Sequence, residues 1–422
     1  MKQYNKYKDS GIDWIGEIPE HWKETRLKYT LDDIICGGTP LTNNSNYWAT
    51  DNNGIPWVSI ADITESGGNL YKTERKITID GLKSKNLKII PKETLLISIF
   101  ASLGKTTTLK IDASVNQAIL GLVAYRKLNK AFLKFYLNYI EYFIAYYSSS
   151  NTQENLNLNK IKNLSIVIPP IPEQTAIANY LDRKTTEIDE LISQKEQLLK
   201  LYDEEKTAII NQAVTKGVPR KDGRSSVSYK DSGIDWLGEI PVHWEVKRMR
   251  FLSEIKTGDK DTENREDSGK YPFYVRSQTV ERISTYSFDG EAILTAGDGV
   301  GVGKVFHYAN GKFDYHQRVY RISNFNDIEG KFLFYYMKQN FYKEVIRISA
   351  KSTVDSLRLP MLQNFPVCFP QKSEQTAIVQ YIEIETNRIN SKITKTEKLI
   401  ELLKEYKTAL ISEVVTGKLK VI

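Results

Sequence analysis

The chain has 422 residues, of which 41% are hydrophobic, so it is long enough to form two or three domains with cores of their own. Its most apolar segment, around residues 143–147, is broken by lysine, glutamate and asparagine, and the chain opens on polar residues, so we expect neither a membrane-spanning helix nor a secretion signal. The net charge of +7 is compatible with a polyanionic partner.

The cysteines also limit the possible classes. Cys36 and Cys368 are the two cysteines of the chain, and no histidine lies close to either in sequence. They predict neither a disulfide framework nor a zinc site. We therefore expect a cytoplasmic protein without a structural metal.

A motif near the start of the chain is repeated. Residues 7–19 return as residues 229–241 with one conservative change, and a His-Trp pair follows each copy. Fixed glycines and a proline indicate a rigid turn, and buried tryptophans act as apolar anchors. We expect a docking element against the helices or a second protein, or else a first turn that packs on the core of its own domain. The tryptophans of this motif are Trp14, Trp22, Trp236 and Trp244.

The first globular region is expected between residues 27 and 155. Its predicted strands are residues 56–60, 94–100, 106–111, 115–123 and 164–168, and its predicted helix is residues 131–147. The second region, residues 250–369, repeats this order. Its predicted strands are residues 271–275, 292–296, 304–308, 318–322 and 365–369, and its predicted helix is residues 330–348. The chain is thus two tandem units.

The first globular region is longer than the second by 21 residues. The additional residues fall between about 30 and 94, where residues 43–54 are rich in asparagine. This segment predicts an exposed polar loop with an aromatic tip. Two domains with the same order of elements but different inserted segments are typical of a protein that applies one architecture to two different targets.

A long amphipathic helix follows each globular region. Residues 173–215 are repeated at constant spacing as residues 374–416, with apolar side chains every three or four positions. Such a narrow apolar face needs a partner, and the other copy is the obvious one, although two unrelated surface helices are the alternative. The apolar positions expected at the helix interface are Leu181, Ile188, Leu199, Ile209, Ile382, Ile389, Ile400 and Leu410. Lys195 and Thr396 interrupt this stripe, and we expect them to face outward rather than to set the helix register.

The link between the units predicts the direction of the helices. Residues 217–228 span at most about 40 Å, whereas a helix of this length forms a rod of roughly 60 Å. The second unit should therefore begin where the first helix ends, so the two helices should be antiparallel. We expect a globular region at each end of the rod, an approximate two-fold relation, and a C-terminus that returns near the N-terminus.

The charge distribution favours the globular regions as the polyanion-binding parts. Residues 173–216 carry six basic and nine acidic groups, and residues 374–418 carry seven of each, which leaves +10 elsewhere. Two modules held at a fixed distance suit a reader of two separated DNA half-sites.

Over its full length the chain resembles the DNA-specificity subunit of type I restriction-modification enzymes. The resemblance is carried by the twin Gly-Ile-Asp-Trp-x-Gly-Glu-Ile-Pro-x-His-Trp motifs, the twin Glu-Gln-Thr-Ala-Ile helix starts, Gly37-Gly38-Thr39-Pro40 with Ile55-Pro56-Trp57-Val58, and Ser114-Val115-Asn116-Gln117-Ala118. It implies two target-recognition domains that each read half of an interrupted sequence, and spacer helices that bind two methyltransferase subunits. The resemblance also implies restriction or translocase subunits that complete the complex. It also implies a noncatalytic subunit without its own cofactor, since S-adenosylmethionine and ATP bind the partners.

The resulting fold class is α+β, with two target-recognition domains and two long antiparallel helices that form a coiled-coil rod. The expected divisions are residues 1–167 and 229–369 for the domains, 168–217 and 370–417 for the helices, 218–228 for a linker and 418–422 for a tail.

Catalytic motifs are missing from the sequence. The glycines before Lys105 and Lys304 lack the spacing of a phosphate-binding loop, and no Asn-Pro-Pro-Tyr or Asn-Pro-Pro-Phe methyltransferase motif occurs. The sequence thus argues against the hypothesis that this protein is an enzyme that acts by itself. A non-DNA adaptor that grips proteins with its two modules stays open as an alternative.

Candidate DNA contacts are polar and basic residues in segments that could reach a groove. In the first domain they are Thr39, Asn43, Asn44, Tyr47, Ser98, Ser102, Lys105, Asn116 and Gln117. In the second domain they are Arg276, Ser277, Gln278, Lys304, His316, Gln317 and Arg318. The two Gly-Lys turns motivate this choice most, because they follow equivalent strands. For each residue the alternative is a solvated loop side chain.

Overall fold

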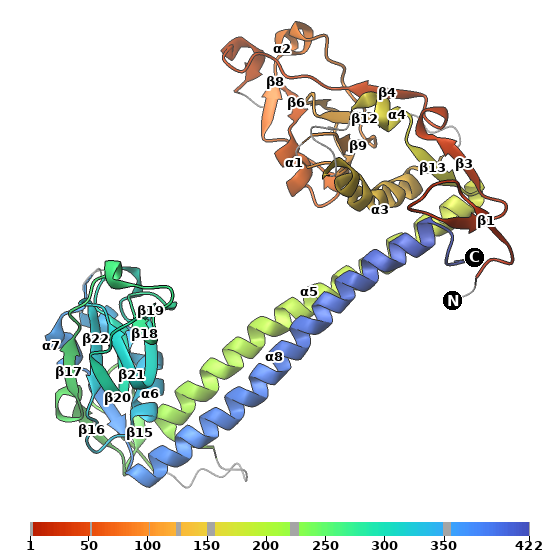
Figure 1. Cartoon of the computed structure of the whole chain (residues 1–422). Helices are drawn as coiled ribbons and strands as arrows, with labels where there is room; N and C mark the ends of the chain where they lie inside the picture. The colour runs from red at the N-terminus through yellow and green to blue at the C-terminus, as the bar shows by residue number, and fades with distance from the viewer. Residues whose placement is uncertain are drawn as a thin grey trace. The chain divides into compact units, whose positions relative to one another are not determined.

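The computed structural model describes residues 3–50, 53–100, 102–123, 128–149, 157–219, 228–348 and 356–421. The chain divides into two compact units (Figure 1). The first unit comprises Met1–Gln194 and Leu399–Ile422, and the second comprises Lys195–Lys398. Each unit therefore contains one globular part and a portion of each long helix.

The described residues of the first unit form several small sheets and, besides the long helices, four α-helices. Its strands are β1 (Tyr7–Asp9), β2 (Glu17–Pro19), β3 (Lys23–Arg26), β4 (Asp33–Cys36), β5 (Trp48–Ala49), β6 (Ile55–Val58), β7 (Asn69–Leu70), β8 (Arg75–Ile77), β9 (Leu95–Ser98), β10 (Thr106–Leu109), β11 (Ser114–Val115), β12 (Ile119–Val123) and β13 (Ser165–Ile168). Its helices besides the long ones are α1 (Ile60–Glu65), α2 (Ile79–Ser84), α3 (Lys130–Ser149) and α4 (Leu158–Lys162). Five of the six elements predicted from periodicity in this region are confirmed as strands or as a helix, whereas the predicted strand 115–123 is divided into β11 and β12, which belong to different sheets.

Two sheets form the body of the first unit. One has the strand order β4-β12-β9-β10-β7, and the other has the order β11-β6-β8-β5. Strand β9 is buried along its whole length, which fits an unbroken apolar run at the centre of a covered sheet. Helix α3 buries Phe132, Leu133, Tyr136, Leu137 and Ile140, so its apolar face points into the core.

The second unit is built around one six-stranded sheet. Its strands are β14 (Tyr229–Asp231), β15 (Glu239–Pro241), β16 (Glu245–Arg248), β17 (Glu254–Thr257), β18 (Tyr271–Tyr274), β19 (Val280–Ile283), β20 (Phe288–Ala296), β21 (Phe306–Tyr315), β22 (Val319–Ser323) and β23 (Pro366–Phe369). Its helices besides the long ones are α6 (Gly330–Ile348) and α7 (Leu359–Gln363). The main sheet has the order β17-β22-β20-β21-β18-β19. The predicted strands and helix of this region are confirmed as well.

The two units repeat the same frame. Each begins with an antiparallel hairpin, β1–β2 or β14–β15, whose register pairs a tyrosine with a proline at its ends. In each unit the next strand pairs with the strand that precedes a long helix, as β3 with β13 and β16 with β23. The duplication read from the sequence is therefore a duplication of structure.

The two long helices, α5 (Ile171–Lys216) and α8 (Lys372–Val415), are antiparallel within each unit. In the first unit an early residue of α5, Asp189, accepts a hydrogen bond from a late residue of α8, Lys407, at 2.7 Å. In the second unit a late residue of α5, Glu205, pairs with an early residue of α8, Arg388, at 2.9 Å. The predicted direction of the helices and the predicted fold class are confirmed.

The apolar stripe accounts for most of the helix interface. Leu181, Ile188, Ile382, Ile389, Ile400 and Leu410 are buried as predicted. Leu199 and Ile209 are only half-buried, and Ile210 takes the inward position that we assigned to Ile209. Thr396 is buried, so its predicted outward orientation is wrong, whereas Lys195 is half-buried. A threonine fits an inward position because its methyl group packs while its hydroxyl can bond to the helix backbone.

The two ends of the chain lie together in the first unit, as predicted. The Tyr7 hydroxyl donates to the Lys418 carbonyl at 3.5 Å, and Lys420 Nζ lies 5.7 Å from the centre of the Tyr4 ring. Gly417 is close to Pro19 and Trp22. Most of the predicted linker, residues 220–227, lies outside the described residues.

Residues 51 and 52 of the segment that we predicted as an exposed loop lie outside the described residues, and tertiary contacts hold the part before them, residues 43–50. Residues 45–47 form a short 3-10 helix that leads into β5. Trp48 is not an exposed tip: its ring meets that of Trp57 edge to face at 5.1 Å, and the Arg75 guanidinium stacks over it at 3.5 Å. The prediction was therefore wrong for Trp48, because its partners are distant in sequence. Among the described residues, no helix is long and apolar enough to cross a membrane.

Candidate nucleic-acid interface

The repeated tryptophan motif docks on the long helices within its own unit. In the second unit Trp244 is fully buried among Ile210 and Val214 of α5 and Ile378 of α8. Its Nε1 donates to Glu374 Oε1 at 3.1 Å. The expectation of docking against the helices is confirmed for this copy.

The first unit uses the same construction with one exchange. His21 Nε2 lies 2.8 Å from Glu173 Oε2, as His243 Nε2 lies 2.8 Å from Glu374 Oε2 in the second unit. The other oxygen of Glu173 accepts a hydrogen bond from the Tyr4 hydroxyl instead of a tryptophan. Burial and this glutamate raise the pKa of Tyr4, so its hydroxyl keeps its proton and acts as the donor.

The outer tryptophans of the motif are half-buried against the globular parts. Trp236 stacks on Phe365 with ring centroids 6.1 Å apart, and its Nε1 donates to Glu344 Oε2 at 2.7 Å. The hydrogen bond from Arg347 outweighs the effect of burial and lowers the pKa of Glu344, which keeps this acceptor ionised. The Trp14 carbonyl accepts a hydrogen bond from Tyr139 of α3. Both readings of the motif, docking on the helices and packing on a core, thus apply.

Strand register gathers most candidates of the first unit at one end of its five-stranded sheet. The last residues of β4 and β9 pair with the first residues of β12. The segments that follow β4 and β9 and the segment that precedes β12 therefore meet. These segments carry Thr39, Ser102, Lys105, Asn116 and Gln117. At this end the Thr39 hydroxyl donates to Gln117 Oε1.

Asn43, Asn44 and Tyr47 come from another part of the first unit. They lie in the segment before β5, where the Tyr47 carbonyl accepts a hydrogen bond from the backbone of Thr78 at 3.1 Å. Asn44 uses its side-chain oxygen to accept from the backbone N–H of Asn46. The segment is thus held by the residues that begin α2, and the Asn44 N–H, which donates to the Leu41 carbonyl at 3.2 Å, connects it to the loop that carries Thr39.

Ser98 is unsuited to a DNA contact. Its side chain is fully buried, and its hydroxyl donates to the Ser102 carbonyl. The serine therefore fixes the turn between β9 and β10, and we remove it from the proposed contact set. Ser102 is half-buried at this turn, with its hydroxyl 3.3 Å from that of Thr64.

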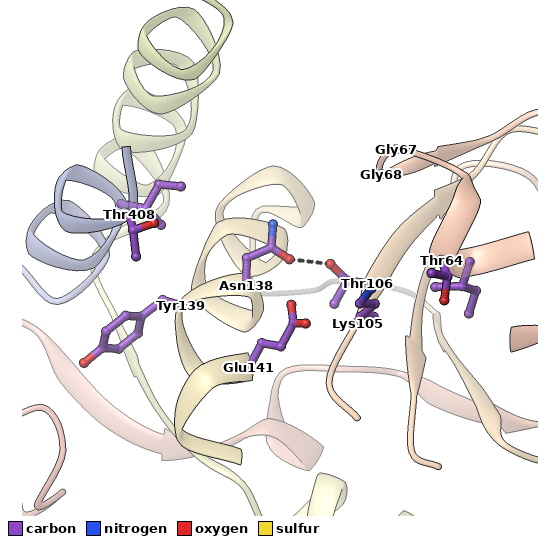
Figure 2. A pocket seen from close by; sticks show the side chains of 11 residues that line it. Thr64, Gly67, Gly68, Lys105, Thr106, Asn138, Tyr139, Glu141 and Thr408 are labelled. Carbon is purple, nitrogen blue, oxygen red and sulfur yellow. Dashed lines mark hydrogen bonds between the residues drawn. The ribbon is translucent and has the colours of Figure 1, made fainter. Parts of the chain in front are cut away.

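The turn that holds Lys105 borders a cavity of about 420 Å³. Figure 2 shows Lys105 and Glu141 near the Thr106–Asn138 hydrogen bond of 2.6 Å, with Thr408 of α8 across the cavity. Partial burial raises the pKa of Glu141, and the charge of Lys105 opposes that effect. The positive charge of Lys105 thus interacts with the Glu141 carboxyl as well as with any anion that binds from outside.

Candidates of the second unit lie in loops that meet beside the end of β20, where Gly297 N–H donates to the Arg318 carbonyl at 2.8 Å and Arg276 binds Asp298. The end of β18 pairs with the end of β21, and the end of β20 pairs with the start of β22. The segments beyond these strand ends carry Arg276, Ser277, Gln278, Lys304, His316, Gln317 and Arg318. Gln278 Nε2 donates to the Lys304 carbonyl at 3.3 Å, and the Ser277 hydroxyl donates to the Thr279 carbonyl.

His316 is a structural member of this group. It is buried, and its Nδ1 accepts a hydrogen bond from the backbone N–H of Arg318 at 2.9 Å. Burial and the charge of Arg276 lower the pKa of His316, which favours the neutral ring that this acceptor role requires. We therefore remove His316, like Ser98, from the proposed contact set.

The two Gly-Lys turns are equivalent, as predicted. Gly104 has φ of +78° and lies against Glu141 of α3, while Gly303 has φ of +68° and lies against Tyr342 of α6. Only glycine adopts this backbone conformation readily so close to a helix. Lys304 Nζ lies 5.2 Å from the centre of the Tyr342 ring.

Two carboxylates of the interface were missed in the sequence. Asp298 binds both Arg276 and Arg318, and Asp261 accepts a hydrogen bond from Gln317 Nε2 at 2.6 Å. The available signal was the alternation of Gly297, Gly299 and Gly301 around Asp298, which we interpreted only as a departure from phosphate-binding and dinucleotide-binding patterns. Arg75, stacked on Trp48, was missed because it lies within the range of the additional residues, between about 30 and 94. No cluster of potential metal ligands occurs among the residues that the structure describes.

A family model described as the type I restriction modification DNA specificity domain matches the chain twice, at residues 19–201 and 241–403. Each match covers most of one globular part and most of the helix that follows it. The two matches together cover well over half of the chain.

Curated relatives are specificity subunits. The chain is 23% identical to the type I restriction enzyme MjaIX specificity subunit of Methanocaldococcus jannaschii, across 96% of this chain and 95% of that protein. It is 28% identical to the EcoDI specificity subunit of Escherichia coli over 43% of this chain, which spans 40% of that relative's length. A solved structure described as showing complex assembly and conformational transition of the type I R-M system matches with a TM-score of 0.72 at 16% identity, across 95% of this chain and 99% of the other.

Proposed function

This chain belongs to the family of type I restriction-modification DNA specificity subunits, and on that premise we propose that it binds one interrupted DNA sequence. The chain is a noncatalytic subunit with two target-recognition domains. In the proposal each domain reads one half of the target, and the long helices set the distance between the halves.

The observation that carries this proposal is the equivalent position of the candidate residues in the two units. In each unit the polar and basic candidates that remain lie mainly at the same end of the main sheet, next to a Gly-Lys turn. Arginine, glutamine and asparagine are the side chains that read base edges, and lysine binds phosphates. The candidate residues at the two sheet ends are different, as the recognition of two different half-sites requires.

The outer faces of the long helices support a role in binding partner proteins. Apolar side chains on these faces stay exposed in both units. They are Leu191, Leu399, Leu402 and Tyr406 in the first unit, and Leu201 and Ile384 in the second. Exposed apolar surface of this kind is typical of protein interfaces. We propose that two methyltransferase subunits dock here, and that restriction or translocase subunits join through them.

Cofactors belong to the partners in this proposal. S-adenosylmethionine would bind to the methyltransferase subunits and ATP to the restriction subunits, and the specificity subunit would hold neither. The complex would act in the cytoplasm, where it meets cellular DNA. In this proposal the chain itself determines where on the DNA the methyltransferase binds.

We predict that the chain, purified with its methyltransferase partner, prefers one interrupted sequence in gel-shift competition. A scrambled duplex of equal length should compete at least about 1,000-fold less well, since specific affinities exceed non-specific ones by roughly 10³–10⁷. Affinity should also fall steeply as salt rises, because phosphate contacts release counterions. Equal competition by the scrambled duplex, or co-purification with proteins but no DNA binding, would favour the adaptor alternative.

A further inference from the structure

One carboxylate joins Arg276 and Arg318 of the second unit. Asp298 Oδ1 accepts a hydrogen bond from Arg276 Nη1 at 3.0 Å, and Asp298 Oδ2 accepts one from Arg318 Nη1. The side chain of Asp298 is 16% exposed, whereas those of Arg276 and Arg318 are 44% and 61% exposed. A recessed carboxylate therefore holds two accessible guanidinium groups at the end of the six-stranded sheet.

The loop around Asp298 is fitted between the two arginine-bearing segments. A Cβ at Gly297 would lie 2.8 Å from the Arg318 carbonyl oxygen, and a Cβ at Gly301 would lie 2.7 Å from the Arg276 carbonyl oxygen. Larger residues would push these segments apart. The Gly297 carbonyl also accepts a hydrogen bond from the backbone of Leu357 at 2.7 Å. The alternating glycines thus have a packing role, which is to place Asp298 between both arginines.

The charges favour a fixed arrangement. Partial burial raises the pKa of Asp298, but hydrogen bonds from Arg318 and Arg276 outweigh this effect and hold the pKa below its usual range. The carboxylate is therefore ionised at neutral pH. Each guanidinium donates to Asp298 through Nη1, which leaves the N–H groups of Nε and Nη2 to bind an acceptor.

The first unit has no such pair at the equivalent positions. Backbone bonds from Ile99 to Ala118 and from Gly297 to Arg318, each 2.8 Å long, define the equivalence. Arg318 therefore corresponds to Ala118, and Asp298, which follows Gly297, corresponds to Phe100. The charged pair belongs to one domain only, as a determinant of one half-site should.

We propose, resting on the proposed function, that Asp298 is a positioning residue for base recognition by the second domain. It orients the guanidinium groups of Arg276 and Arg318 toward guanine in the major groove. Guanine presents O6 and N7 as paired acceptors there, and the planar arginine fork matches them. A fork that is fixed before binding loses less conformational entropy and accepts fewer alternative bases than a free one.

The test is selection from a randomised duplex library by the full chain in complex with its methyltransferase partner. The wild-type complex should select a two-part motif with guanine in one part. Asp298→Asn should keep the other part of the motif and weaken the guanine preference by roughly 5- to 150-fold, the range of one bidentate contact. Asp289→Asn is the matched control, because it removes the same charge from an exposed residue of β20 and should leave the motif unchanged.

A second pair of variants covers the case in which Asp298→Asn disturbs folding. Arg318→Lys and Arg276→Lys keep the charge but lose the fork, and at least one of them should lose the guanine preference at an unchanged melting temperature. A wild-type motif from all three variants, or equal weakening of both parts of the motif by Asp298→Asn, would overturn the assignment. If the wild-type complex selects no motif at all, the proposed function itself fails.

Discussion

Replacing Trp244 by alanine is expected to destabilise the second unit by about 3–5 kcal/mol, the usual effect of truncating a buried tryptophan. The side chain is fully buried between both long helices and the core, and its ring lies 6.3 Å from that of Phe332. The alanine variant would leave a cavity, and Glu374 Oε1 would lose the hydrogen bond that Trp244 Nε1 donates to it. Thermal unfolding should show the transition of the second unit lowered by about 10 °C.

Phe251→Ala is the matched control for this effect. Phe251 is an aromatic residue of the same unit, but it is 61% exposed. Its replacement should change the free energy of unfolding by no more than about 0.5 kcal/mol. If Trp244→Ala unfolds like the wild type, the tryptophan does not anchor the globular part to the helices, and the docking role of the repeated motif is wrong.

Lengthening both long helices is expected to lengthen the DNA spacer that the complex prefers. Seven residues inserted after Lys200 of α5 and after Thr394 of α8 preserve the apolar seam, because seven residues make two turns of a coiled coil. The Lys206–Asn390 and Glu205–Arg388 contacts place these insertion points opposite one another. The insertion adds about 10 Å of helix, or at most about three base pairs of duplex.

The readout is the preferred motif of the lengthened complex. Both half-sites should stay the same while the spacer grows by one to about three base pairs. Insertion into α5 alone is the control: it makes the two helices unequal in length, so contacts between them are lost and the melting temperature should fall instead. An unchanged spacer in the doubly lengthened protein would show that the helices do not measure the distance between half-sites.

The long helices and their direction could be predicted because a single period governs them. Apolar residues at every third or fourth position predicted the buried faces, and the short link predicted that the helices are antiparallel. Thr396 was misjudged because polarity alone does not tell which way a threonine faces inside an apolar stripe. Ile209 was misjudged because Ile210, its neighbour, is equally apolar, and only packing chooses between them.

The candidate interface was less predictable because it depends on contacts between loops. Ser98 lies in a strand that is buried on both faces, so alternation gave no sign that its hydroxyl points into a turn. Asp298 joins residues from segments on either side of it in sequence, and no periodic pattern records such a pairing. Trp48 was assigned to an exposed tip, since its partners Trp57 and Arg75 become neighbours only after the sheet has formed.

The most direct test of the account is a map of methylated adenines in host DNA with and without this gene. The account predicts one interrupted motif whose modified adenines are present only with the gene and are lost together on its deletion. The same methylation in both strains, or a single uninterrupted motif, would contradict the claim that two domains on one chain each read half of a target.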